Sequence, residues 1–221
     1  RDIIDNRHSC YVGELGIGSN PNILSWLRKS DLVIAFGLRL GEMNTIGSGV
    51  MNGFTLFDVP VPSQKLIQIH SGLEELNRVY QANLAILSSP APMAAALEKS
   101  EALISIPWDQ WTLDARAEYQ NYTNTDCCPE PVLLPSIYRW LRDRLPEDAI
   151  LTNGAGTYAG WSQRYFQHHQ LQTQLGPISG GMGYGLPAAI AAKLHRPKSI
   201  VIAIGGDGCF LMNSEELATA V

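Results

Sequence analysis

The sequence lacks several features that would assign it to a specialised class of protein. No run approaches the roughly 18 apolar residues of a membrane-spanning helix. Basic residues are outnumbered, 16 against 21 acidic ones, which gives a formal net charge of −5. No basic stripe is present to neutralise phosphates of a nucleic acid. We therefore expect a cytoplasmic protein with neither a membrane nor a nucleic acid as partner.

Cysteine is scarce as well. The four cysteines include one adjacent pair and have no metal-ligand spacing: Cys10, Cys127, Cys128 and Cys209. This pattern favours reduced thiols over a disulfide framework or a zinc site.

Short apolar runs alternate with helical patterns in two segments, which predicts parallel sheets covered by helices. In the first segment we predict strands at 31–37, 65–70 and 85–88 and helices at 19–30, 72–81 and 92–104. Ser19 or Asn20 would cap the first helix, with Pro21 in its first turn. In the second segment we predict strands at 149–153 and 199–204 and helices at 133–145, 158–167 and 184–195.

A polar helix at 108–122 and a turn-rich connector separate the two segments. We predict a partial first domain over 1–123, a linker over 124–130 and a second domain over 131–221. The fold class is α/β, with two doubly wound parallel-sheet domains, both incomplete. The first lacks a clear opening strand, and the helix expected from Asn213 stops after about two turns.

Three glycine-bearing turns follow strands or precede helices of the second segment, at 153–160, 179–185 and 205–208. Ligands of parallel-sheet proteins bind at the carboxyl ends of the strands. Glycine lets the backbone approach a ligand closely and adopt positive φ. We therefore expect these turns to line one crevice.

Acidic residues are absent from 149–206, whereas Arg164, Lys193, Arg196 and Lys198 lie there. This favours an anionic ligand, and the next acid, Asp207, would suit a Mg²⁺ ion that bridges to it. Asp207 could instead be an ordinary turn residue. The capping box that begins at Asn213 is better explained as helix initiation than as ligand binding.

A dinucleotide site is the nearest competing interpretation. Gly154, Gly156 and Ala159 have the spacing of its glycine fingerprint after a predicted strand. The acid that should follow about 20 residues later is missing.

Several motifs resemble the thiamine-diphosphate enzymes. GGDGCFLMNSEELATAV is similar to the start of their cofactor signature, and ISGGMGYGLPAAIAAKL is similar to another of their segments. YVGELGIGSNP, DLVIAFGLRLGEM and KLIQIHSGLEEL resemble their middle domain, particularly in acetolactate synthases. The likeness covers nearly the whole chain and implies a Rossmann-like middle domain followed by a thiamine-diphosphate-binding fold.

The resemblance implies a role for each turn. Asp207 would be the Mg²⁺ ligand, Gly180 would accept a hydrogen bond from the aminopyrimidine, and Met182 would be the wedge that holds the cofactor bent. The remaining residues expected to contact the cofactor are Gly156, Thr157, Tyr158, Gly181, Gly206, Gly208 and Cys209. Gly181 and Cys209 stand where the family usually has small hydroxyl residues.

The family's activating glutamate and paired asparagines have no counterpart here, so no catalytic residue is assigned. We expect a fragment that is inactive alone. The intact protein would decarboxylate a 2-keto acid and join the product to a second keto acid, as acetolactate synthases do, or act as a decarboxylase or lyase. A homodimer or homotetramer is implied, and FAD is possible, with Arg39 as a conceivable contact. A non-catalytic module stays an alternative.

Overall fold

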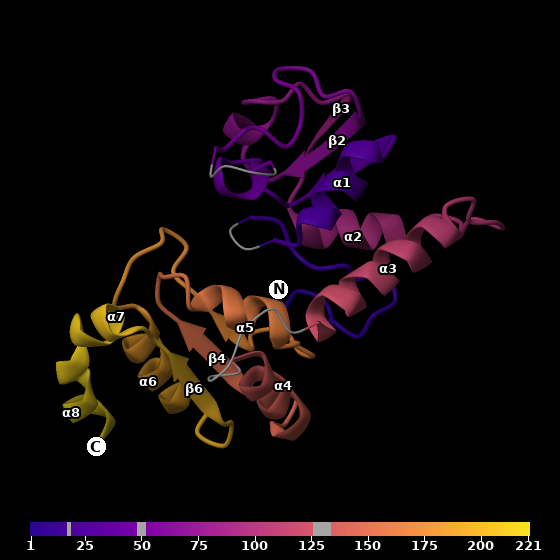
Figure 1. Ribbon diagram of the computed structural model, residues 1–221. Coiled ribbons are helices and arrows are strands. Elements are labelled where there is room, and N and C mark those ends of the chain that lie inside the picture. Colours follow the sequence, from indigo (N-terminus) through magenta and orange to yellow (C-terminus); the bar gives the residue numbers. More distant parts are fainter. Residues whose placement is uncertain (17–18, 48–51, 126–133) are drawn as a thin grey trace. The chain divides into compact units, whose positions relative to one another are not determined.

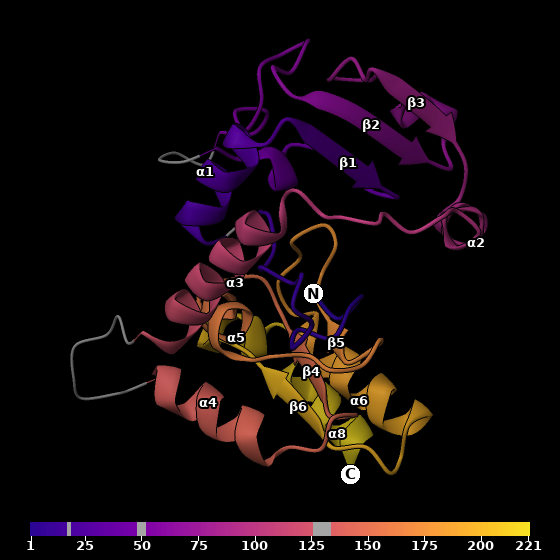
Figure 2. The ribbon, with the colours of Figure 1, turned by 90° about the vertical axis from the view of Figure 1, so that its right-hand side faces the viewer.

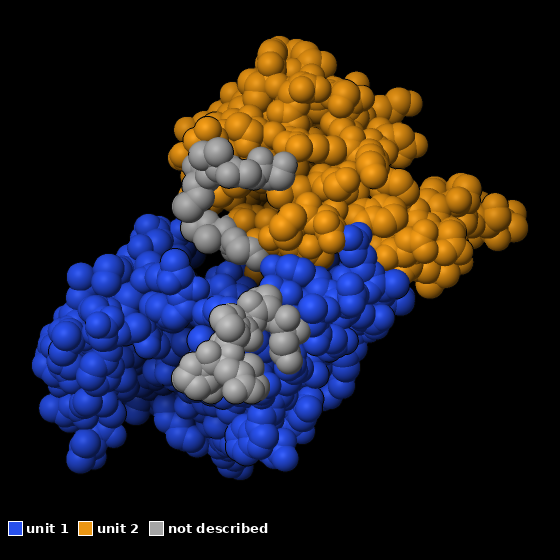
Figure 3. Space-filling view, viewed as in Figure 1, with its two compact units in different colours: residues 1–13, 116–221 blue, residues 14–115 orange. Residues whose placement is uncertain are grey.

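The computed structural model describes residues 1–16, 19–47, 52–125 and 134–221. These residues form two compact units (Figure 3): unit 1 consists of residues 1–13 and 116–221, and unit 2 of residues 14–115. Most of the predicted linker, residues 126–130, lies outside the described residues. The predicted domain bounds stay a prediction, because compact units defined by packing need not coincide with evolutionary domains.

Unit 2 contains a three-stranded parallel sheet (Figure 2), as the alternating pattern predicts. Its strands lie in the order β1 (Leu32–Phe36), β2 (Lys65–His70) and β3 (Leu84–Leu87). Helix α1 (Pro21–Lys29) precedes β1, and helix α2 (Pro90–Glu98) follows β3. The predicted cap of α1 is confirmed for Asn20, whose side chain accepts a hydrogen bond from the Asn22 N–H at 3.0 Å.

The helix predicted at 72–81 is wrong, because only a 3₁₀ turn, η2 (Leu73–Glu75), forms there. The buried side chain of Gln68 takes the backbone groups that a helix would use. Its Nε2 donates to the Glu75 carbonyl at 3.0 Å, and its Oε1 accepts from the Asn77 N–H at 2.9 Å. Asn77 itself adopts a φ of 58°, which cannot continue a right-handed helix. A second 3₁₀ turn, η1 (Met43–Thr45), lies between β1 and β2.

Unit 1 is built on a second parallel sheet, with strand order β5 (Gln174–Leu175), β4 (Ile150–Asn153), β6 (Val201–Ile204). Helices α4 (Leu134–Arg144) and α5 (Ala159–Tyr165) lie on one face and α6 (Gly185–His195) on the other (Figure 1). Successive side chains of a strand point to opposite faces, and β4 follows this rule. Leu151 packs in the core with Tyr138 and Tyr165, whereas Thr152 donates to the Gly185 carbonyl.

The residues after β6 differ from the prediction in two ways. A short helix, α7 (Asp207–Leu211), begins at Asp207, where a simple turn was expected. The capping box at Asn213 is also wrong, because this residue makes no side-chain cap hydrogen bond to the turn η3 (Ser214–Glu216) that follows it. Its amide nitrogen donates instead to the Gly183 carbonyl at 2.9 Å. The last element is α8 (Leu217–Ala220).

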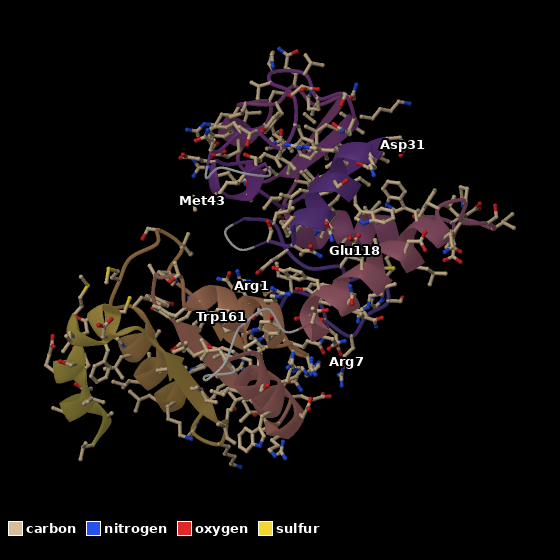
Figure 4. The ribbon with its side chains drawn as sticks, in the orientation of Figure 1. Arg1, Arg7, Asp31, Met43, Glu118 and Trp161 are labelled. Atoms are coloured by element: carbon tan, nitrogen blue, oxygen red, sulfur yellow. The ribbon has the colours of Figure 1, made fainter. Side chains whose placement is uncertain are left out.

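Helix α3 (Asp109–Asn124) confirms the predicted polar helix. Residues 116–124 of α3 belong to unit 1, together with the first thirteen residues. Arg116 connects these two segments, since its Nη1 donates to the Asn6 carbonyl at 3.0 Å and also to the Tyr11 carbonyl. Arg7, labelled in Figure 4, pairs with Asp5 and with Glu147 of the same unit, at 2.7 and 2.6 Å.

No helix within the described ranges is both long enough and apolar enough to cross a membrane.

Candidate cofactor-binding site

All three glycine turns lie at the carboxyl edge of the sheet in unit 1. Residues 154–158 follow β4, residues 176–184 follow β5, and Gly205 and Gly206 follow β6. Because the three strands are parallel, their carboxyl ends meet at one edge. The three turns therefore meet at one edge of the sheet, as expected, but they line two hollows rather than the single crevice that the sequence predicts.

The N-terminus of α6 is packed tightly against the ends of two strands. A Cβ added at Gly185 would lie 3.0 Å from the Gly154 nitrogen, 3.1 Å from the Asn153 carbonyl carbon and 3.3 Å from the Ile204 oxygen. These atoms are all backbone, so they cannot move aside as a flexible side chain can. Glycine at this position lets the turn before α6 approach those after β4 and β6.

Tyr158 bridges the first and third turns. A Cβ at Gly156 would lie 2.5 Å from its ring, and one at Gly206 would lie 3.1 Å from the same ring. The Tyr158 hydroxyl would lie 2.7 Å from a Cβ at Gly154. The hydroxyl is buried and makes no hydrogen bond of good geometry within the described residues, with the Cys209 thiol and the backbone of Gly154 and Gly206 close to it. Burial raises the pKa of Tyr158 to about 12, so the phenol stays protonated near neutral pH.

Cys209 also packs against the turn after β4. Its side chain is buried, and its Sγ donates to the Ala155 carbonyl at 3.0 Å. A Cβ at Gly154 would lie 3.0 Å from the same sulfur. The thiol therefore connects α7 to the turn after β4, a contact that a serine hydroxyl at this position could also make.

Met182 joins the second turn to the third. Its terminal methyl would lie 3.3 Å from a Cβ at Gly208. About half of its side chain is exposed, at 48%, so it is not a core methionine. Gly180 adopts a φ of +69° and meets no described atom within 4 Å of an added Cβ, and Gly181 meets only Ser179 there. These two glycines therefore lie at the open side of the turn, and Thr157 is likewise exposed.

Two hollows adjoin these turns. The smaller, of about 360 Å³, is lined by Gly154, Gly185, Leu186, Ala203, Ile204, Gly205, Gly206, Asp207, Cys209 and Phe210. The larger, of about 840 Å³, includes Pro177, Ile178, Met182, Tyr184 and Asn213 in its lining. The acid Asp207 thus lies at the smaller hollow, and the apolar thioether of Met182 lies at the larger one.

The basic residues of the acid-free stretch do not reach these hollows, since neither described lining contains a basic side chain. Arg164 donates to the Tyr122 carbonyl and lies 3.8 Å from the ring centroid of that tyrosine. Lys193 donates to the Ser199 carbonyl, and Arg196 donates to Gln172. An anion in these hollows would therefore be held by backbone N–H groups, hydroxyl donors and a bound cation rather than by basic side chains.

Asp207 is the acid at the smaller hollow. Its side chain is exposed, and its Oδ1 accepts a hydrogen bond from the Gly208 N–H at 2.8 Å. No cluster of three or more His, Cys, Asp or Glu side chains that could hold a metal occurs within the described residues. A divalent ion at Asp207 would need further ligands from outside these side chains, as Mg²⁺ commonly takes from phosphate and water.

The residues present fit a diphosphate-bearing cofactor with a hydrophobic ring system. Gly180 and Gly205 have open space where a Cβ would lie, and the buried Tyr158 hydroxyl offers a donor beside Gly154. Arg39, the conceivable flavin contact, lies in unit 2 and pairs with Glu75 at 3.3 Å.

Comparison with known proteins identifies the family. Residues 1–97 match the model for the central domain of thiamine pyrophosphate enzymes, and residues 154–221 match the C-terminal TPP binding domain of the same enzymes. The two matches cover most of the chain, in the order that the family has them. The chain belongs to the thiamine pyrophosphate enzymes, with two incomplete parallel α/β sheets from the central and C-terminal domains.

The curated relatives include several acetolactate synthases. The isozyme 2 large subunit of Escherichia coli (strain K12) is 29% identical over 210 residues, which is 95% of this chain and 36% of that protein. The large subunit of Corynebacterium glutamicum is 29% identical over 223 residues, or 96% of this chain and 34% of that protein. The chain therefore spans about a third of the length of these relatives.

Sequence reasoning missed two residues at this site. It assigned Asn213 to helix initiation, and it gave no role to Thr152, whose Oγ1 donates to the Gly185 carbonyl at 2.6 Å. Thr152 is fully buried and follows the apolar Ile150 and Leu151 in its strand, so a hydroxyl in that position was the available signal. The family matches favour the thiamine interpretation over the dinucleotide site considered for Gly154, Gly156 and Ala159.

Proposed function

We propose that this chain is part of a thiamine-diphosphate- and Mg²⁺-dependent enzyme that decarboxylates a 2-keto acid and joins the product to a second keto acid. The convergence of the three glycine turns on one sheet edge, with a single acid beside them, is the observation that carries the proposal. The acetolactate synthases among the relatives support the carboligation. When bound, the cofactor supplies the carbanion stabilisation that this chemistry needs.

The residues of this chain would bind and orient the cofactor. Asp207 would hold Mg²⁺, and the backbone at Gly156, Thr157, Tyr158, Gly206, Gly208 and Cys209 would surround the diphosphate. Gly180, Gly181 and Met182 would adjoin the rings, where Met182 offers an apolar, adaptable surface. No proton-transfer group is assigned within the chain, so we propose that it is inactive without further domains of the intact protein. A cytoplasmic homodimer or homotetramer is part of the same proposal, and FAD binding stays a prediction.

The test is calorimetric titration of the intact protein with thiamine diphosphate, with and without Mg²⁺. Asp207→Asn removes the negative charge while keeping the shape of the side chain. It should weaken Mg²⁺-dependent binding by about tenfold or more, as expected for the loss of an anionic metal ligand. The matched control is Asp143→Asn, because Asp143 is an exposed acid of unit 1 that pairs with its neighbour Arg142.

Three results would contradict the proposal. They are no binding by the wild-type protein, binding that is independent of Mg²⁺, and equal binding by Asp207→Asn and the wild type. The first would favour a non-catalytic module. If the wild-type protein does bind the cofactor, formation of acetolactate from pyruvate by the intact protein tests the carboligation. Release of the aldehyde instead would favour a decarboxylase.

A further inference from the structure

Asn213 forms a contact across the site that its place in the sequence does not suggest. Its Nδ2 donates to the Gly183 carbonyl at 2.9 Å, over a separation of thirty residues. Its own backbone is held on both sides, because its N–H donates to Phe210 and its carbonyl accepts from Glu216. The side chain is therefore aimed at the turn before α6 rather than at the helix that follows it.

The partner of this bond is adapted to the contact. Gly183 adopts a φ of +83°, which disfavours any residue with a side chain. A Cβ at Gly183 would lie 2.7 Å from Nδ2 of Asn213 and 3.1 Å from Cβ of Met212. Glycine is thus required here both by backbone conformation and by the closeness of Asn213.

The bond fixes the Gly183–Tyr184 peptide group, one residue beyond Met182. The Met182 side chain leaves the backbone one residue before Gly183, and its methyl approaches Gly208. Asn213 follows α7, which begins at Asp207, so it connects the end of the site that carries the acid to the end that carries the thioether. Met182 and Asn213 also line the same hollow of about 840 Å³.

We infer that Asn213 is a positioning residue: its amide holds the Gly183 carbonyl and thereby directs Met182 toward the rings of the cofactor. This inference rests on the proposed function. Asn213 should then affect the binding of the ring part of the cofactor and leave the binding of its diphosphate part unchanged.

The experiment compares two ligands in the presence of Mg²⁺, thiamine diphosphate and inorganic pyrophosphate, with the intact protein. Asn213→Asp keeps the size of the side chain but removes the amide donor. We expect it to weaken thiamine diphosphate binding by about tenfold, the equivalent of one hydrogen bond, and to change pyrophosphate binding less than about twofold. Glu215→Gln is the control, because Glu215 is exposed and lies two residues away.

A double-mutant cycle gives a second readout that a general loss of structure would not reproduce. If Asn213 acts through Met182, then Asn213→Asp should have less than about a twofold effect on thiamine diphosphate binding in a Met182→Ala background. Additive effects would overturn the inference. So would an equal loss for both ligands, or unchanged binding of thiamine diphosphate by Asn213→Asp. Failure of the wild-type protein to bind thiamine diphosphate would instead contradict the proposed function, and this inference with it.

Discussion

Asn6 and His168 bind each other through two hydrogen bonds. The backbone N–H of Asn6 donates to the His168 carbonyl at 2.9 Å, and the backbone N–H of His168 donates to Oδ1 of Asn6 at 2.9 Å. The Asn6 amide also donates to the carbonyls of Arg1 and Ile4. Both residues are buried, so this pair makes the first thirteen residues an integral part of unit 1.

Replacing Asn6 by alanine should therefore destabilise unit 1. The substitution leaves the buried His168 N–H and two backbone carbonyls without their partner, which should lower the free energy of unfolding by about 2–3 kcal/mol. Urea denaturation measures the change. Gln120→Ala, on an exposed position of α3, is the control and should stay within about 0.5 kcal/mol of wild type. An equal loss of unfolding free energy in both variants would contradict a specific stabilising role of the Asn6 side chain.

His168 should make stability depend on pH. Burial lowers its pKa from 6.5 to about 4, and its Nδ1 lies 3.0 Å from Oγ1 of Thr173. Below pH 6.5 the unfolded chain takes up a proton that the folded chain does not, so folding is disfavoured as the pH falls. The free energy of unfolding should drop by about 2 kcal/mol between pH 7 and pH 5 from this residue alone.

The measurement is denaturation at both pH values for wild type and His168→Gln. The variant should lose most of this pH dependence, whereas His195→Gln, at an exposed histidine in the last turn of α6, should retain it. If the free energy of unfolding of His168→Gln falls between pH 7 and pH 5 as much as that of the wild type, His168 is not the source of the pH dependence.

Two glycine-to-alanine substitutions should have opposite effects on the stability of unit 1. At Gly185 the new methyl would meet three backbone atoms at 3.0–3.3 Å, which should cost about 1–3 kcal/mol of stability. At Gly160, within α5, the added Cβ meets no described atom within 4 Å. Alanine there should be neutral or stabilise by up to about 1 kcal/mol, because it favours the helix. Thermal unfolding of the two variants gives the comparison, and equal effects would contradict the tight packing of α6 on the strand ends.

The sequence predicts those parts of the fold that local patterns encode. The strand from Leu32 is a short apolar run, those from Lys65 and Ile150 are rich in isoleucine and leucine, and the glycine turns are recognisable by composition. Contacts between distant residues carry no such signal. Asn6 and His168 lie 162 residues apart, and β5 has only two residues, too few to show a periodicity.

Side chains that bind backbone groups account for the wrong predictions. Gln68 removes the hydrogen-bonding groups of Glu75 and Asn77 from a helix, although the sequence after Gly72 has a helical pattern. Asn213 has the composition of a helix cap but donates to Gly183. In both cases tertiary hydrogen bonds outweigh a local preference of a few tenths of a kcal/mol to about 1 kcal/mol.

Tyr158 should show a conflict between stability and binding. Its buried hydroxyl makes no hydrogen bond of good geometry in the described part of the chain, so Tyr158→Phe should leave the free energy of unfolding unchanged or raise it by about 1 kcal/mol. If the hydroxyl serves the diphosphate, the same variant should weaken Mg²⁺-pyrophosphate binding by about tenfold. Such a residue is retained for function at a cost in stability.

Tyr165→Phe is the matched control, because the Tyr165 hydroxyl donates to the Thr125 carbonyl at 3.0 Å and lines neither hollow. The Tyr165 ring stacks on Trp161, which is labelled in Figure 4. This variant should lose about 1 kcal/mol of stability and bind pyrophosphate as the wild type does. The pair of tyrosines thus separates a hydroxyl that serves the fold from one that serves a ligand. A Tyr158→Phe variant that binds pyrophosphate normally would remove the hydroxyl from the site and leave only the ring as packing for the glycine turns.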